Sequence, residues 1–322
     1  MAEFRSAFAP FFRSFIQYQK ASGKWNNSSY EPSLIRFDRF CASNYPEDKE
    51  LTQEMVDSWC RQREGEINNS CRSRINVVVS FVRYLCRRGL TLISPPEVPQ
   101  NEKSTYIPHA FTMEELGRFF HECDSITPYA QTREHRSRQI TVPVYFRLLY
   151  SSGIRTNEAR MLQSADVNLS DGVLNIRYSK GHNQHYIVLH DSMLKLMRTY
   201  DWAIGKLYPD RTYFFPARNG GFHKSDWVQT NFRQLWDVAN RSHATAYELR
   251  HHYAIENINR WVDDGFGFDS KLLYLSKSMG HATIESTRYY YSLVPGMSHL
   301  LKEHTEDGFN ALIPEVDDED WK

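Results

Sequence analysis

The C-terminal half of the sequence carries cationic residues that are widely separated along the chain and are followed by three consecutive tyrosines. They are Arg155, Lys180, Arg250 and His281, with Tyr289, Tyr290 and Tyr291 after them. Arginine forks onto phosphate oxygens, lysine can protonate a leaving oxygen, and a tyrosine hydroxyl can attack phosphorus once nearby cations lower its pKa. Together these side chains could cleave and rejoin a phosphodiester. A phosphotyrosine would conserve the bond energy, which agrees with the absence of a Walker A motif and of GxGxxG.

Residues 1–92 are predicted to form a helical domain. Four segments place apolar residues at intervals of three and four, as amphipathic helices do: residues 8–19, 33–45, 51–66 and 70–89. Thr52 is suited to cap the third helix, and Gly89 is suited to end the fourth. Residues 93–109 contain four prolines and few core residues, and they are predicted to be a linker.

A second domain of mixed secondary structure is predicted from residue 110. TMEE at Thr112 fits a capping box before a helix. VLNIRY and HYIVLH alternate like two strands joined by the turn SKGHNQ. Further helices are expected over residues 140–151, 155–163, 191–206, 226–241, 245–259, 270–278 and 283–291. The predicted fold class is therefore mainly α with a small antiparallel β-sheet.

The segments around these polar residues resemble, in the same order, the motifs of the tyrosine recombinases, the phage-type integrase family. SSGIRTNEARML carries Arg155 and Glu158, SKGHNQHY carries Lys180, YELRHHYA carries Arg250 and His251, and GHATIESTRYYY carries His281, Thr287 and the tyrosines. The family's nucleophile follows the histidine by nine residues, which selects Tyr290. The resemblance covers residues 110–295, and the N-terminal helices resemble the family's core-binding domain more loosely.

The resemblance implies a site-specific DNA recombinase that cleaves and rejoins DNA through a 3′-phosphotyrosine intermediate and needs neither cofactor nor metal. Arg155, Arg250 and His281 would stabilise the transition state, while Lys180 protonates the leaving 5′-oxygen. Tyr247 stands where the family has a histidine, and its phenol would donate a hydrogen bond to the phosphate. Glu158 would orient Arg155, and His251 would support the site by packing.

The resemblance also implies a division of labour along the chain. Residues 1–92 would clamp DNA, and residues 110–295 would form the catalytic domain. Residues 93–109 would link these two domains, and residues 296–322 could dock into a neighbouring subunit. Five arginines are expected to contact the DNA backbone: Arg72, Arg74, Arg83, Arg87 and Arg88. The family works as a tetramer on two double-stranded DNA sites. The expected setting is integration or excision of a mobile element, in the cytoplasm and associated with the nucleoid.

The formal charge of zero hides an asymmetry. Residues 303–322 contain eight acids and one lysine, a net charge of −7, which leaves +7 on the first 302 residues. A basic body permits DNA binding, and the acidic end is either a solvated tail or a competitor of DNA for the basic surface. No apolar run approaches the length of a membrane helix. Five cysteines without CxxC pairing indicate reduced thiols.

Other interpretations remain open at this stage. Arg155 and Glu158 could be an ordinary helix pair, Lys180 a turn residue, and His281 a packed residue at a helix start. His182 and His185 are the closest histidine pair, but no third metal ligand lies near them in the sequence. Two alternative functions are a type IB topoisomerase, which would relax DNA without a specific site, and a non-catalytic DNA-binding relative, which the tyrosine at position 247 favours.

Overall fold

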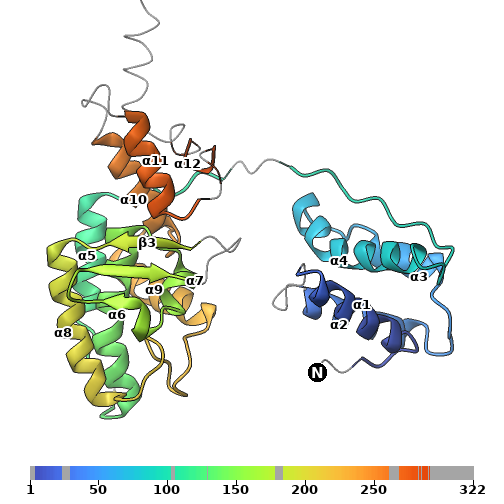
Figure 1. Ribbon diagram of the computed structural model, residues 1–322, viewed down its shortest axis with the longest axis horizontal. Helices are drawn as coiled ribbons and strands as arrows, with labels where there is room; N and C mark the ends of the chain where they lie inside the picture. The colour runs from blue at the N-terminus through green and yellow to red at the C-terminus, as the bar shows by residue number, and fades with distance from the viewer. Residues whose placement is uncertain are drawn as a thin grey trace, which may run out of the picture. The chain divides into compact units, whose positions relative to one another are not determined.

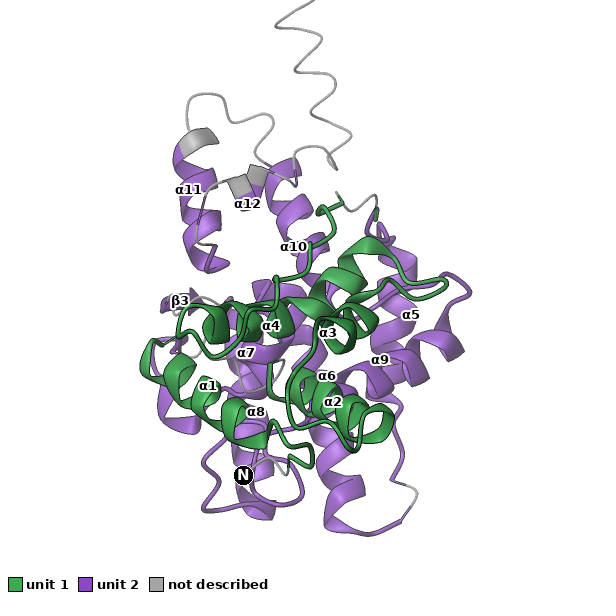
Figure 2. Ribbon diagram, turned by 90° about the vertical axis from the view of Figure 1, so that its right-hand side faces the viewer, with its two compact units in different colours: residues 1–106 green, residues 107–322 purple. Residues whose placement is uncertain are grey.

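The computed structural model of the chain contains two compact units, residues 1–106 and residues 107–322. Figure 1 labels the helices and the strand β3, and Figure 2 colours the two units separately. Each unit has its own hydrophobic core. The structure describes residues 4–23, 30–102, 106–128, 130–177, 184–260, 268–281, 283, 285–288 and 290.

The described part of the first unit contains helices joined by loops, and no strand. It contains α1 (Ala9–Ala21), α2 (Tyr30–Asn44), α3 (Gln53–Cys60) and α4 (Asn68–Cys86). Their apolar faces meet in an aromatic core, in which the Phe12 ring lies 4.6 Å from that of Phe81 and 6.0 Å from that of Phe37. Thr52 caps α3 as predicted, because its hydroxyl accepts a hydrogen bond from Met55 N at 3.3 Å. All four predicted helices are present.

The third helix ends six residues earlier than predicted, because Glu66 stabilises a turn after it. The Glu66 carboxylate accepts hydrogen bonds from Arg63 N at 3.1 Å and from Arg74 Nη2 at 2.7 Å. Arg74 also donates to the carbonyl oxygens of Trp59 and Arg61. The charge of Arg74 is therefore used inside the unit, and the structure does not favour the predicted contact of this residue with DNA.

The proline-rich stretch predicted as a linker packs against the first unit along its first part. Ile93 is buried in the core, and Ser94 N donates to Gln53 Oε1 at 2.8 Å. Farther along, Arg72 donates to Pro99 O at 2.9 Å. The extended backbone offers carbonyl groups that polar side chains of α4 can bind, so the chain up to Glu102 belongs to the first unit. This contact also occupies Arg72, which was predicted to bind DNA.

The second unit packs helices around a small antiparallel sheet of β1 (Val167–Asn168), β2 (Val173–Ile176) and β3 (His185–Val188), in that order. The register pairs Val173 with Val188 and Ile176 with His185. The helices are α5 (Met113–Asp124), α6 (Arg133–Ser152), α7 (Thr156–Arg160), α8 (Asp191–Leu207), α9 (Ser225–Ala239), α10 (Glu248–Asn259), α11 (Phe268–Ser278) and α12 (Glu285–Arg288). Thr112 forms the predicted capping box with Glu115. The predicted fold class, mainly α with a small antiparallel sheet, is confirmed.

The five cysteines carry free thiols, and four of them are buried: Cys41, Cys60 and Cys71 in the first unit and Cys123 in the second. Burial raises the pKa of Cys41, Cys60 and Cys123 to about 12. Among the described residues, no helix is long and apolar enough to cross a membrane.

A buried carboxylate ties the start of the chain to α2, which gives a test of the fold. Asp38 is fully buried and accepts hydrogen bonds from Arg5 N at 2.6 Å, Ser6 N at 3.0 Å and Ser6 Oγ at 2.6 Å. Asp38→Ala should lower the free energy of unfolding by about 2 to 4 kcal/mol, because it leaves these donors without their charged acceptor. Urea denaturation measures the change. The exposed Asp48→Ala is the matched control, and an equal effect of both substitutions would contradict the prediction.

Candidate active site

Arg155 is placed by a tight turn between two helices. Gly153 ends α6 with φ +62°, and a Cβ at this position would lie 2.3 Å from Tyr253 Cδ1, so the close approach of the two segments requires glycine. Arg155 then caps α7. The buried Glu158 carboxylate accepts hydrogen bonds from Arg155 N at 3.1 Å and Arg155 Nη1 at 2.5 Å. This contact agrees with the expectation that Glu158 orients the guanidinium.

Arg250 lies in the first turn of α10 and is almost completely buried, with 2% of its surface exposed. Its Nη1 donates to Gly153 O at 2.5 Å, and its Nη2 donates to Met279 O at 2.7 Å. The start of α10 is fixed by Glu248, whose carboxylate accepts from Thr245 N at 2.5 Å. The guanidinium therefore joins the end of α6, the start of α10 and the residues after α11.

His281 follows a second left-handed glycine, Gly280 with φ +62°. Arg155 Nη2 donates to Gly280 O at 2.7 Å, and Arg250 Nη2 lies 3.0 Å from His281 Nε2. Because a guanidinium can only donate, His281 Nε2 accepts, and its protonated Nδ1 donates to Thr287 Oγ1 at 2.7 Å. Burial, followed by the charges of Arg250 and Arg155, lowers the pKa of His281 to about 4, so its imidazole is neutral near pH 7.

Tyr290 lies beside these cations. It is 3% exposed and packs in a small hydrophobic cluster with residues of α10 and α11. Its ring lies 6.2 Å from the His281 ring in a stacked arrangement and 5.5 Å from the His251 ring. The tyrosine that spacing predicts as the nucleophile thus lies beside two imidazole rings. Tyr289 and Tyr291 lie outside the described residues.

Tyr247 is more exposed to solvent than Arg250 and Tyr290, with 42% of its surface exposed. It is the N-cap of α10, and its ring contacts that of His251 in an edge-on arrangement at 5.2 Å. His251 therefore lies between Tyr247 and Tyr290. Burial is the main cause that lowers the pKa of His251. The structure brings every predicted residue of this site together except Lys180, which lies outside the described residues.

The electrostatics of this group favour an anion. Burial, and then the like charge of Arg155, lower the pKa of Arg250. Within the described part of the chain, Glu158 forms an ion pair with Arg155, and no carboxylate forms one with Arg250. A buried guanidinium without a carboxylate is costly unless a ligand supplies the charge. The described residues contain no cluster of histidine, cysteine or carboxylate groups that could hold a metal ion.

Sequence reasoning missed one side chain and three backbone groups at this site. His185 on β3 lies under Gly280, where an added Cβ would approach its Cε1 to 2.5 Å, and its Nε2 is 3.8 Å from Glu158 Oε2. The carbonyl groups of residues 153, 279 and 280 hold the two arginines. Gly153, two residues before Arg155, and Gly280, directly before His281, were the available signals, because glycine readily adopts the left-handed conformation that a tight turn needs.

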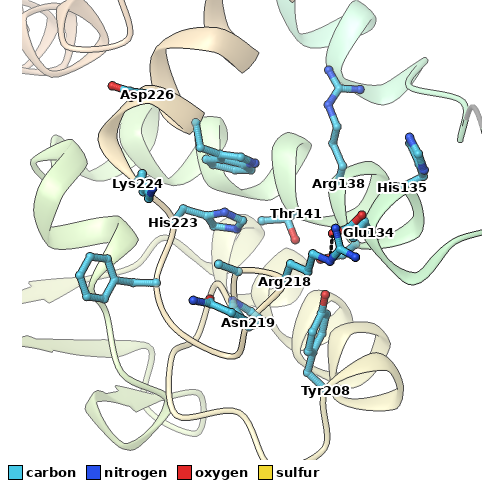
Figure 3. Close-up of a pocket in the computed structure, with 15 residues that line it drawn as sticks. Glu134, His135, Arg138, Thr141, Tyr208, Arg218, Asn219, His223, Lys224 and Asp226 are labelled. Carbon is cyan, nitrogen blue, oxygen red and sulfur yellow. Dashed lines mark ion pairs between the residues drawn. The ribbon is translucent and has the colours of Figure 1, made fainter.

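A separate hollow of about 550 Å³ lies elsewhere in the second unit. Figure 3 shows its lining, which comes from α6, the start of α9 and the segment before α9. Arg218 there is ion-paired with Glu134 at 2.6 Å, and burial lowers the pKa of His223 to about 4. None of the residues grouped around Arg250 lines this hollow. The predicted site is therefore distinct from it.

Protonation of His281 should destabilise the folded chain. Between pH 6.5 and about 4 the unfolded chain binds a proton at this histidine that the folded chain does not bind, so stability should fall as the pH falls through this window. His281→Gln should therefore weaken the loss of stability between pH 7 and pH 5, as measured by urea denaturation. The exposed His121→Gln is the control, and an unchanged pH dependence in His281→Gln would refute the assignment.

Comparison with known proteins identifies the family. Residues 110–295 match the model of the Phage integrase family. Tyrosine recombinase XerC of Oceanobacillus iheyensis is 24% identical over 261 residues, 78% of this chain and 77% of that protein. Tyrosine recombinase XerD of Rickettsia prowazekii is 22% identical over 312 residues, 90% of this chain and 93% of that protein.

Two solved structures have a similar fold. XerH site-specific recombinase bound to difH substrate, in a pre-cleavage complex, has a TM-score of 0.59 at 17% identity and covers 90% of this chain and 82% of that chain. A lambda integrase dimer bound to a COC′ core site has a TM-score of 0.57 at 14% identity and covers 88% of this chain and 94% of that chain. Since the family model spans more than half of the sequence and includes Arg155, Arg250, His281 and Tyr290, the chain belongs to the phage integrase family of tyrosine recombinases, which are DNA strand-transferases.

Proposed function

We propose that this chain is a site-specific recombinase that cleaves and rejoins double-stranded DNA through a 3′-phosphotyrosine intermediate. The observation that carries the proposal is the convergence of three distant segments on one buried cationic centre. Arg155 Nη2 contacts Gly280 O, Arg250 Nη2 contacts His281 Nε2, and the Tyr290 ring lies beside the His281 ring. A phosphodiester would supply the negative charge that Arg250 lacks among the described residues, where Glu158 forms its ion pair with Arg155.

In the proposed reaction, the hydroxyl oxygen of Tyr290 attacks the scissile phosphorus. A bond forms between this oxygen and phosphorus, and the bond to the 5′-oxygen breaks. Arg155 and Arg250 neutralise the non-bridging oxygens, where charge develops. Both guanidinium groups are already held by backbone carbonyl groups, so little reorganisation accompanies the reaction.

Two proton transfers accompany this exchange of bonds. The proton of Tyr290 passes to Nε2 of the neutral His281 imidazole after the Arg250 guanidinium has turned from this nitrogen to the phosphate, and the resulting imidazolium adds positive charge beside the phosphate. Lys180, in the segment between β2 and β3, protonates the leaving 5′-oxygen. Reversal of the same steps, with a 5′-hydroxyl of another strand as the attacking group, releases Tyr290 and joins the strands.

We also propose that the chain acts as a homo-tetramer on paired DNA sites and serves a mobile element. One solved relative is a lambda integrase tetramer bound to a Holliday junction, which supports an assembly of this kind. Strand exchange between two duplexes requires four nucleophiles, one for each strand. The segment proposed to dock into a neighbouring subunit, residues 296–322, lies outside the described residues.

Covalent trapping tests the nucleophile. Duplexes bound by the protein are selected from a random library, and a nick is placed near the centre of the selected site so that the cleaved strand end is lost. We expect an SDS-resistant protein–DNA adduct, with peptide mass mapping the modified residue to Tyr290. Tyr290→Phe should abolish the adduct, because it removes the attacking oxygen, without loss of DNA affinity.

The matched control for this test is Tyr274→Phe, at a tyrosine of α11 that is 70% exposed. It should form as much adduct as the unchanged chain. An adduct at Tyr289 or Tyr291 would retain the enzyme class and refute the choice of Tyr290. Tight binding without any adduct would replace the proposal by a non-catalytic DNA-binding function, and relaxation of plasmids without a selected site would indicate a topoisomerase.

Substitutions at Tyr247 test whether its hydroxyl donates a hydrogen bond to the phosphate. Tyr247→Phe keeps the ring against His251 but removes the hydroxyl, and loss of a hydrogen bond to a charged group should slow adduct formation about tenfold or more. Tyr247→His should retain more activity than Tyr247→Phe, because its ring N–H can donate. Single-turnover rates measure both. A Tyr247→Phe rate equal to that of Tyr274→Phe would exclude a catalytic role for the hydroxyl.

A further inference from the structure

His185, the first residue of β3, has its side chain on the buried face of the strand. His185 and Ile187 are buried, whereas the residue between them and the residue after them are exposed. His185 is 8% exposed, and in the sheet it is paired with Ile176 of β2. An imidazole at such a position costs free energy unless it interacts with polar groups. The groups that surround it therefore indicate what it does.

Glu158 lies on one side of this imidazole. Its Oε2 atom is 3.8 Å from His185 Nε2, which is within the distance of an ion pair and longer than a hydrogen bond. The same carboxylate accepts hydrogen bonds from N and Nη1 of Arg155. The side chains of Glu158 and His185 are 2% and 6% exposed. Water consequently screens the interaction between them only weakly.

The turn at Gly280 lies on another side of the imidazole. A Cβ added at Gly280 would lie 2.5 Å from His185 Cε1 and 3.1 Å from Arg155 Nη1, so the glycine backbone lies against both side chains. The carbonyl oxygen of Gly280 accepts a hydrogen bond from Arg155 Nη2 at 2.7 Å. The imidazole thus contacts both groups that hold the guanidinium, which are the Glu158 carboxylate and the Gly280 turn.

The position of Arg155 depends on these two groups. Glu158 binds Arg155 at the backbone and at the guanidinium, so a rotation of the carboxylate would move the guanidinium with it. The imidazole occupies the space into which the carboxylate would otherwise turn. A misplacement of about 1 Å at a reacting group can cost about a hundredfold in rate. A side chain that limits this rotation therefore has an effect on the reaction without touching the phosphate.

We infer that His185 is a positioning residue for Arg155. From β3 it restricts the Glu158 carboxylate and the turn at Gly280, so that the guanidinium stays directed at the scissile phosphate. His185 takes no part in the exchange of bonds or in the two proton transfers. The inference rests on the proposed function for the role of Arg155, whereas the contact between His185 and Glu158 does not.

Packing alone is the alternative role of a buried imidazole, and Leu189 provides the control for it. Leu189 follows β3, is also 8% exposed and belongs to the core of the second unit. It lies four residues after His185, which is about 13 Å along an extended chain. Leu189→Ala therefore removes packing near the same strand without removing a group from beside Glu158.

The first experiment is a double-mutant cycle on the full chain, with the midpoint of urea denaturation as the readout. His185→Ala and Glu158→Gln should each lower the midpoint. Together they should lower it by less than the sum of the two single shifts, because either substitution already disturbs the contact between these side chains. Leu189→Ala combined with Glu158→Gln should lower the midpoint by the sum of the single shifts.

The second experiment measures the single-turnover rate of adduct formation on the nicked duplex used to test Tyr290. His185→Ala should slow this rate about tenfold with unchanged affinity for the duplex, because a loosened Arg155 is misplaced at the reacting phosphate while the other contacts with DNA remain. His185→Gln should recover most of the rate, since its amide N–H group can donate to Glu158. In the Glu158→Gln background, His185→Ala should slow the rate by no more than about twofold.

The two experiments decide the inference together. Equal rates for His185→Ala and Leu189→Ala would overturn it, even if the urea shifts are non-additive, because the contact would then be structural only. Additive shifts of His185→Ala and Glu158→Gln would also overturn it. If the unchanged chain forms no adduct on DNA that it binds, the proposed function fails and the urea cycle alone decides: non-additive shifts keep His185 as the support of Glu158, and additive shifts overturn the inference.

Discussion

The structure of the second unit depends on the burial of one guanidinium. Arg250 is surrounded by the end of α6, the start of α10 and the turn after α11, and it donates to a carbonyl group of each neighbouring turn. Burying this charge is unfavourable by itself, so the end of α6 and the turn after α11 must supply acceptors in fixed positions. The same contacts that hold the two Nη atoms of Arg250 bring His281 Nε2 within 3.0 Å of Nη2. The burial of Arg250 and the position of His281 therefore depend on the same contacts.

Two left-handed glycines make this arrangement sterically possible. Gly153 lies two residues before Arg155, and Gly280 lies directly before His281. A Cβ added at Gly153 would approach the Tyr253 ring to 2.5 Å or less, and a Cβ added at Gly280 would approach the His185 ring equally closely. Their carbonyl groups face the arginines, Arg250 at the first and Arg155 at the second. Glu158 completes the pattern, since it both caps α7 and holds the Arg155 side chain. Backbone shape and cation placement are consequently set by the same few residues.

Local patterns in the sequence were sufficient for much of this architecture. The apolar stripe of α4, the capping box at Thr112 and the alternation in β2 and β3 are properties of neighbouring residues, and the sequence predicts all three. The start of α6 was missed by several residues because its first turns, REHRSRQ, lack an apolar period. The two-residue strand β1 is too short to produce any pattern.

Contacts between distant segments were not predictable in the same way. The motif order indicated Arg155, Arg250, His281 and Tyr290, but nothing local indicates that carbonyl groups of residues 153 and 279 bind Arg250. The engagement of Arg74 by Glu66 depends on a turn that the helical pattern concealed. Likewise, His185 contributes to the site only because β3 passes under the turn at Gly280. Such contacts follow from tertiary packing, which one sequence does not display.

The distribution of cysteines has a practical consequence for the study of this chain. Cys41, Cys60 and Cys71 are enclosed in the core of the first unit, and Cys123 is enclosed in that of the second. A thiol with a raised pKa inside a packed core reacts with alkylating reagents only after that core opens. The rates at which these native thiols are alkylated therefore measure how often each unit opens, without any engineered cysteine. DNA that holds one unit closed would be detected as protection of that unit's cysteines alone.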